Sequence, residues 1–307
     1  MGPETQPSGP QSKELPEHGN GAKARRLLWT YSSLMPFFDW YFLFLAVWTS
    51  CVFGEVCGKI TCTQGKSESL IERLKHAKIV DLTQNYTNET IYWTEGKTFF
   101  LQKEIYKDPS PGVPWVQVDN IAEATHGGTH IDAPLHFHEG GWSVADIPIE
   151  RLMYVPIVKL DIRRQAEADP NYITAVSDIQ DWERRYGKVP AGSFFLLQTG
   201  QSRFWPNRTA YMGLDENGDR HFPSLGAEAA TFLTTERSPY AIGVDAASLD
   251  HYPETSVHLI LAVASVYSIE NMADLSLVPA TGALGIVLPM RIPGASGAPT
   301  RVVATIP

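Results

Sequence analysis

Cysteine is scarce in this sequence and is confined to its N-terminal part. The three cysteines of the 307-residue chain are Cys51, Cys57 and Cys62. Their position excludes a catalytic thiol and a cysteine-ligated zinc site from the rest of the chain, because both need a thiolate. Cys57 and Cys62 can form a small disulfide in an oxidising compartment or pair between chains, and three cysteines alone decide neither arrangement.

Positive charge is also in short supply. The chain has 25 Lys and Arg against 34 Asp and Glu, a formal net charge of -9. Binding to nucleic-acid phosphates needs clustered Lys and Arg, and no basic face stands out after residue 80. We therefore expect no nucleic-acid partner. The hydrophobic share of 43% is typical of a globular protein with a full core.

Long hydrophobic runs are missing except near the N-terminus. Residues 27–53 are strongly apolar but are interrupted by Pro36 and Asp39. The unbroken part, residues 40–54, is short for a membrane-spanning helix and suits the hydrophobic region of a signal peptide. Adding residues 34–38 reaches a spanning length at the cost of placing Asp39 in the bilayer. A cleaved signal and an uncleaved anchor fit these lengths equally well.

Basic residues before this segment predict its orientation. Lys23, Arg25 and Arg26 favour a cytoplasmic N-terminus and a lumenal or extracellular catalytic part. We therefore predict a protein that is secreted or membrane-anchored, so that a membrane is a possible partner. Three N-glycosylation sequons agree with export, although such tripeptides also arise by chance. They begin at Asn85, Asn88 and Asn207.

These features predict four parts of the chain. Residues 1–26, rich in Pro, Gly, Ser and Glu and ending in the basic cluster, are predicted to be a disordered tail. Residues 27–58 are the signal peptide or signal-anchor, residues 59–78 a linker, and residues 79–307 the main domain.

Strand and helix patterns alternate through the main domain. Predicted strands include residues 79–83, 115–118, 154–160, 193–197, 240–244 and 265–269. Predicted helices include residues 228–236, 257–264 and one that begins after an N-cap at Ser177 and ends at Gly187. The alternation predicts the α/β class, whereas periodicity alone does not give the topology.

Histidines cluster in one glycine-containing stretch. It reads His126-Gly-Gly-Thr-His130-Ile-Asp132-Ala-Pro-Leu-His136-Phe137-His138. This density is typical of a metal site, because imidazole and carboxylate are ordinary ligands of Zn²⁺ and Mn²⁺. A straight strand or one helix face does not bring His126, His130 and Asp132 together, so we expect the glycine pair and Pro134 to provide a bend. The alternative is a polar loop whose histidines cluster by chance.

This stretch resembles the signature of the cyclase-like metal hydrolases, which include bacterial-type kynurenine formamidase and isatin hydrolase. The signature is His-x-Gly-Thr-His-x-Asp-x-Pro-x-His-Phe, and residues 126–137 match it without a gap. Residues 195–200, 242–250 and 288–301 are similar to further segments of the family. The resemblance covers residue 79 to the C-terminus. One departure is Ala246-Ala247, where many members carry threonine or another polar residue.

The resemblance implies the swivelling β/β/α fold and a metal centre. His126, His130 and Asp132 would hold one ion, and Asp132 would bridge to a second ion held by His258 and Glu270. The metal is Zn²⁺ or Mn²⁺, with one or two ions per chain. An open coordination position would bind water, whose pKa falls from about 16 toward 7 on such an ion.

The implied activity is hydrolysis of a small aromatic amide. His136 would carry a proton from water to the leaving nitrogen. Arylformamidase activity is favoured, converting N-formyl-kynurenine to kynurenine and formate. The alternatives are a hydrolase of isatin-like or other cyclic amides and, from another class, a secreted or membrane-tethered binding protein with a non-catalytic metal site. The complete ligand set favours an enzyme, and the resemblance implies a homodimer. Three aromatic residues can line a pocket, although core packing is expected for each: Phe137, Trp142 and Trp205.

Overall fold

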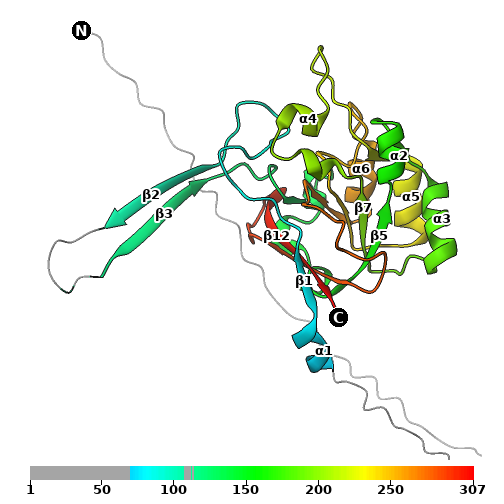
Figure 1. Ribbon diagram of the computed structural model, residues 1–307, viewed down its shortest axis with the longest axis horizontal. Coiled ribbons are helices and arrows are strands. Elements are labelled where there is room, and N and C mark those ends of the chain that lie inside the picture. Colours follow the sequence, from blue (N-terminus) through cyan, green and yellow to red (C-terminus); the bar gives the residue numbers. More distant parts are fainter. Residues whose placement is uncertain (1–69, 107–111, 113) are drawn as a thin grey trace, which may run out of the picture. The chain divides into compact units, whose positions relative to one another are not determined.

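An eight-stranded sheet forms the centre of the part of the chain that the structure describes. The structure is a computed structural model and describes residues 70–106, 112 and 114–307 (Figure 1). The strand order is β1-β12-β11-β5-β7-β9-β10-β4, and β12 also pairs with β4, so that the paired strands close into a ring. The strands are β1 (Lys78–Asp81), β4 (His130–Asp132), β5 (Val155–Asp161), β7 (Phe194–Gln198), β9 (Ala241–Val244), β10 (Tyr267–Glu270), β11 (Leu284–Pro289) and β12 (Gly297–Ile306).

Parallel strands and helices occupy the middle of this order. β5, β7, β9 and β10 pair in parallel with one another, in that order. Parallel pairing needs a crossover, and each crossover here contains a helix: α3 (Val176–Tyr186), α5 (Ala227–Glu236) or α6 (Ser256–Val263). These helices lie along one side of the sheet (Figure 1). The predicted α/β class is confirmed, and the strands predicted at 154–160, 193–197 and 240–244 correspond to β5, β7 and β9.

The two faces of the parallel strands pack into two different cores. In β7, Phe195 and Leu197 pack with helix residues such as Trp182. Phe194 and Leu196 point the other way and pack with a second cluster that includes residues of β4, β10 and β12. Because successive side chains of a strand alternate, the apolar run Phe194–Leu197 of β7 is buried on both faces.

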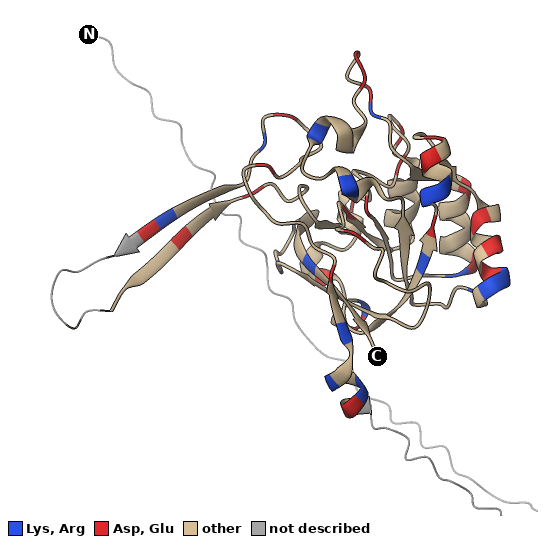
Figure 2. Cartoon of the chain, in the orientation of Figure 1, with Lys and Arg blue, Asp and Glu red and all other residues tan. Residues whose placement is uncertain are grey.

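Helix α3 shows how a covering helix is built. Its charged residues are Asp178, Asp181, Glu183, Arg184 and Arg185, and the charges of the helix are visible in Figure 2. Ile179 and Trp182 are its buried residues. The helix ends before Gly187 as predicted, but the predicted N-cap at Ser177 is wrong. The cap residue is Ala175, because its backbone N–H donates to the Asp178 carboxylate at 2.8 Å and so starts the helix earlier.

The remaining elements lie in the connections. They are α1 (Leu70–His76), α2 (Arg163–Ala168), α4 (Arg208–Met212), the paired strands β6 (Ile173–Thr174) and β8 (Ser224–Leu225), and four short 3₁₀ helices, η1 (Pro134–His136), η2 (Val144–Asp146), η3 (Ile149–Arg151) and η4 (Gln201–Phe204). A hairpin of β2 (Phe100–Tyr106) and β3 (Val116–Ala122) joins two segments that line the cavity described below. Its strands expose apolar side chains, among them Phe100 and Ile121.

Several predictions concern residues outside this description. The tail at 1–26, the signal or anchor at 27–58, the first part of the linker at 59–78 and all three cysteines lie outside the described residues. Within residues 70–106, 112 and 114–307, no helix is both long enough and apolar enough to cross a membrane.

Candidate metal centre

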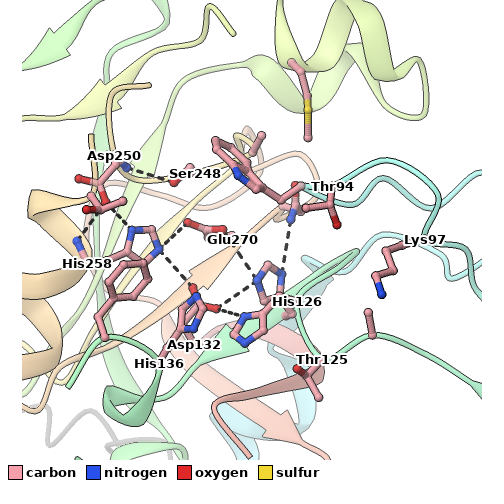
Figure 3. A pocket seen from close by; sticks show the side chains of 18 of the residues that line it. Thr94, Lys97, Thr125, His126, Asp132, His136, Ser248, Asp250, His258 and Glu270 are labelled. Carbon is pink, nitrogen blue, oxygen red and sulfur yellow. Dashed lines mark hydrogen bonds and ion pairs between the residues drawn. The ribbon is translucent and has the colours of Figure 1, made fainter. Parts of the chain in front are cut away.

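A cavity of about 400 Å³ opens beside strands β4 and β10. The side chains predicted as metal ligands and proton carrier all line it (Figure 3): His126, His130, Asp132, His136, His258 and Glu270. They come from the turn before β4, from β4 itself, from η1, from α6 and from β10. The fold therefore brings together residues from both halves of the main domain.

The pairing of β4 with β10 places two of these side chains opposite one another. His130 faces Glu270 in the register, and Asp132 faces Ser268. Side chains directly opposite in an antiparallel pair lie close together on the same face. This register brings Glu270 to the histidine cluster, and Ser268 donates a hydrogen bond to Asp132 Oδ2 at 3.0 Å.

The donor atoms form two groups that share Asp132. We call His126, His130 and Asp132 the local triad, and Asp132, His258 and Glu270 the assembled triad. The ligand atoms of each triad lie within 4.8 Å of one another. Asp132 Oδ1 is 2.7 Å from His126 Nδ1 and 3.1 Å from His130 Nε2, whereas Oδ2 is 3.6 Å from His258 Nε2. The two oxygens of one carboxylate therefore face different triads.

Glu270 also reaches both groups. Its Oε1 lies 3.0 Å from His258 Nε2, and its Oε2 lies 3.8 Å from His130 Nε2. The Leu249 backbone N–H donates to Oε1 at 3.2 Å and helps to fix the carboxylate.

Each histidine uses one ring nitrogen for an outer contact and turns the other toward the carboxylates. His130 Nδ1 lies 3.0 Å from the Gly128 carbonyl, and His126 Nε2 lies 2.9 Å from Ser296 Oγ. His258 Nδ1 contacts the Asp250 carboxylate. If the outer nitrogens carry the protons, three unprotonated nitrogens and two carboxylates converge. This is the donor set that a divalent cation needs, so the residues fit a metal ion.

The glycine pair supplies the predicted bend. Gly128 has φ of +56°, a conformation that favours glycine. A Cβ on Gly127 would lie 2.2 Å from the Tyr92 ring, and a Cβ on Gly128 would lie 2.7 Å from the Tyr86 ring. The tyrosines pack directly on the turn and hold it against β4. Pro134 begins η1, which carries His136.

Electrostatics favour positive charge at this centre. Burial opposes a charged imidazole, but Asp132 and Glu270 outweigh burial and raise the pKa of His130 to about 9. For His258, burial is likewise outweighed by Glu270, Asp132 and Asp250, which raise its pKa well above the ordinary value. Burial alone would raise the pKa of Asp132, but the histidines around it lower that pKa well below the ordinary range. A divalent cation would supply the same positive charge while the imidazoles stay neutral.

His136 differs from the other histidines. Its ring stacks on His126 with centroids 3.9 Å apart, and Phe137 contacts it edge-on at 4.5 Å. Burial lowers the pKa of His136 to about 4, and the neighbouring His126 and His258 add to this effect. The imidazole is therefore neutral at pH 7 and can accept a proton.

Packing, rather than lining a pocket, is expected for all three aromatic residues, and this holds for Trp142 and Trp205 but is wrong for Phe137. Phe137 lines the cavity, whereas Trp142 and Trp205 are not among its lining residues. Trp142 packs under the Arg151 guanidinium at 4.8 Å, and Trp205 packs edge-on against Tyr211 at 5.2 Å. The aromatic residue that the sequence does not single out is Trp93, which lines the cavity.

Other contacts of the donor residues differ in how far the sequence points to them. Ser268 belongs to no recognisable motif, whereas Ser296 lies in the segment 288–301 that resembles the family. Asp250 ends the segment 242–250, so its place in a family-like motif is the signal that could have pointed to it. The three sequon residues Asn85, Asn88 and Asn207 are exposed, and the Asn207 side chain caps α4 by accepting from the Ala210 N–H at 3.1 Å.

The family model "Putative cyclase" matches residues 80–251, more than half of the chain. The chain belongs to this cyclase family. It is 28% identical to isatin hydrolase of Roseibium aggregatum over 192 residues, covering 59% of this chain and 72% of that enzyme. It is 29% identical to kynurenine formamidase of Bacillus anthracis over 232 residues, covering 75% of this chain and 98% of that enzyme.

A solved structure shows the same fold in this cyclase family. Isatin hydrolase A from Ralstonia solanacearum superposes with a TM-score of 0.70 at 26% identity, covering 79% of this chain and 99% of the other. This confirms the fold predicted from the resemblance. The matches support a metal-dependent hydrolase of the cyclase family and do not fix its substrate or its metal.

The comparisons contradict the predicted location. The relatives are bacterial enzymes, and the alignment that covers 98% of the Bacillus anthracis kynurenine formamidase leaves a quarter of this chain without a counterpart. The prediction of a secreted or membrane-anchored protein depends chiefly on residues 23–58, and the matched family region begins only at residue 80. That prediction is wrong. The prediction of glycosylation depends on it and loses its support as well.

Proposed function

We propose that this cyclase-family protein is an arylformamidase that hydrolyses N-formyl-kynurenine to kynurenine and formate. The observation that carries the proposal is the sharing of Asp132 between two triads, since one carboxylate placed between two donor groups is suited to bridging two cations. The kynurenine formamidase relatives, matched over nearly their whole length, support this substrate.

The metal ligands in this proposal are those of the two triads. His126, His130 and Asp132 would hold one Zn²⁺ or Mn²⁺, and His258 and Glu270 would hold a second together with Asp132. A divalent cation bound there supplies a Lewis acid that activates water and polarises an amide carbonyl. Gly128, Ser296 and Asp250 fix the orientation of the three imidazoles through their outer nitrogens.

His136 carries the proton in this scheme. Its ring lines the cavity beside both triads and stacks on His126, and burial lowers its pKa although Asp132 and Glu270 act in the opposite direction. It takes a proton as water adds to the formyl carbon and returns it to the aniline nitrogen as the C–N bond breaks. Kynurenine leaves as the free amine and the formyl carbon leaves as formate.

Isatin hydrolysis is the second candidate. The solved isatin hydrolase structure, covered over 99% of its length, favours it. Isatin also carries an amide on an aromatic ring, so the same residues can act on it. The two candidates differ in their charged groups, since N-formyl-kynurenine carries a carboxylate and an ammonium group and isatin carries neither.

The test is turnover of both substrates by the full chain after chelation and after adding back Zn²⁺ or Mn²⁺. The proposal predicts hydrolysis of N-formyl-kynurenine that disappears on chelation and returns with one of the metals. Turnover of isatin alone would replace the first candidate with the second. A protein that binds metal but hydrolyses neither would favour the binding-protein alternative. The expected homodimer stays a prediction, which sedimentation of the same sample would check.

A further inference from the structure

One wall of the cavity is formed by a segment that carries no metal donor. Trp93, Thr94 and Lys97 line the cavity together with Thr125. In Figure 3, Thr94 and Lys97 lie at the side of the cavity away from Asp250 and His258. A substrate held between the metal donors and this wall would present its reacting amide to the donors and the rest of its structure to residues 93–97.

Two arginines hold Trp93 in place. Its backbone carbonyl accepts from Arg208 Nη2 at 3.2 Å and from Arg220 Nη2 at 3.1 Å. The Arg220 guanidinium also packs on the Trp93 ring at 4.1 Å and on the Tyr252 ring at 4.9 Å. Charge-assisted hydrogen bonds and cation–π contacts together fix an aromatic side chain that is 39% exposed. A fixed and partly exposed indole is suited to contact an aromatic ring.

Lys97 is the basic side chain on the wall of the cavity that carries no metal donor. The other fully charged side chains that line the cavity are acidic: Asp132, Asp250, Glu254 and Glu270. Lys97 is the one Lys or Arg among the lining residues, and it is exposed to solvent. Asp132 and Glu270 would be ligands of a bound cation, so Lys97 is the charged group that can attract a carboxylate on the opposite wall. A molecule whose reacting amide lies at the metal donors can therefore place its carboxylate beside Lys97.

We propose that the pocket selects aromatic amides that carry a carboxylate, with Trp93 against the aromatic ring and Lys97 paired with the carboxylate. This inference rests on the proposed function, because it concerns the aromatic ring and the carboxylate of the substrate, which the metal donors do not contact. In this proposal Lys97 determines specificity. Trp93 supplies the aromatic contact in the cavity, which Trp142 and Trp205 do not reach. The neutral isatin would lack the Lys97 contact.

The test is a binding comparison that does not depend on turnover. Kynurenine and kynuramine differ by one carboxylate, and their affinities for the metal-loaded full chain can be measured by calorimetry. The wild-type protein should bind kynurenine roughly two- to fivefold more tightly than kynuramine, the size expected for an exposed ion pair. Lys97→Met should remove this preference, Lys97→Arg should keep most of it, and Lys188→Met, a change of an exposed lysine outside the cavity, should leave it intact.

Equal wild-type affinities for the two ligands, a preference that survives in Lys97→Met, or no binding of either ligand would each overturn the proposal. Trp93→Leu should weaken both ligands by a similar factor, because the ring contact is common to them. This binding test and the turnover test of the proposed function can fail independently. Turnover of N-formyl-kynurenine without a carboxylate preference would leave the arylformamidase standing and remove Lys97, whereas a preference without turnover would keep Lys97 and remove the arylformamidase.

Discussion

The local and assembled triads meet at Asp132 but are built in different ways. The local triad comes from one short segment bent by Gly127-Gly128, whereas the assembled triad needs the pairing of β4 with β10 and the placement of α6. Their outer contacts differ as well. His126 is supported by the neutral Ser296 hydroxyl and is 25% exposed at its side chain, while His258 is supported by the Asp250 carboxylate and is 10% exposed.

This difference indicates that the two triads bind metal with unequal affinity. A carboxylate on the outer nitrogen makes an imidazole a more basic ligand than a hydroxyl does, and burial protects the site from solvent. The assembled triad should therefore retain its ion longer than the local triad as a chelator is added. Asp132 belongs to both triads, so disturbing it should affect them equally.

The largest effect is expected from Asp132→Ala. The substitution removes the shared carboxylate, so both triads lose a ligand and the protein should lose bound metal and turnover together. Metal per chain, measured by mass spectrometry of the dialysed protein, and hydrolysis of N-formyl-kynurenine check this. Asp119→Ala, on the exposed hairpin strand β3, serves as the control and should change neither. An Asp132→Ala protein with full metal content would contradict the role of Asp132 as a ligand shared by both triads.

His136→Ala should separate metal binding from chemistry. Since His136 belongs to neither triad, metal content should stay near that of the wild-type protein, while turnover falls by roughly 10²- to 10⁴-fold, the usual contribution of a general acid–base. The measurement is the rate at saturating substrate with metal content determined on the same sample. Normal turnover would show that another group carries the proton.

The chelated protein should lose stability as the pH rises. The pKa of His130 is raised from 6.5 to about 9, so the charged ring stabilises the folded state fully below pH 6.5 and this contribution disappears as the pH passes 9. Denaturant unfolding of the chelated protein should show a loss of up to about 3 kcal/mol over this window. In the metal-loaded protein the imidazoles are neutral ligands, and the loss should be absent. The same slope with and without metal would contradict His130 as a ligand.

The smallest effects should sharpen the contrast between the triads. Asp250→Asn removes the charge behind His258 and should weaken metal binding at the assembled triad by roughly 10- to 100-fold. Ser296→Ala removes the hydroxyl behind His126 and should cost less, since a neutral hydrogen bond is weaker than a charged one. Competition with a chromogenic chelator measures both. A larger loss in Ser296→Ala than in Asp250→Asn would reverse the order of the two triads.

The sequence reveals the local triad because its residues are neighbours in the chain. The spacing of His126, His130 and Asp132 and the glycines between them indicate a metal site without any knowledge of the fold. The alternation of buried strands and helices likewise predicts the α/β class. The prediction that the helix starts after Ser177 is wrong because the Ala175 N–H donates to the Asp178 carboxylate. Residue preferences at the cap do not decide between Ser177 and this alternative start.

The assembled triad and the cavity wall cannot be predicted from residues that are neighbours in the sequence. His258 and Glu270 are identified only through the resemblance, because strand register decides that Glu270 faces His130. Trp93 and Lys97 belong to no motif. The position of Trp93 depends on contacts with Arg208 and Arg220, which are far away in the sequence. Residues 27–58 led to a wrong prediction, since their hydrophobicity and flanking charge suggested a location that the relatives contradict.

The most direct test of the central claim is anomalous diffraction from crystals of the zinc-loaded full chain. Two zinc peaks are expected, one among the donors of the local triad and one among those of the assembled triad, with an Asp132 oxygen bound to each. A single zinc would fit if it used Asp132. Zinc bound only by residues outside both triads, or an Asp132 carboxylate that contacts no metal in the loaded protein, would contradict the account.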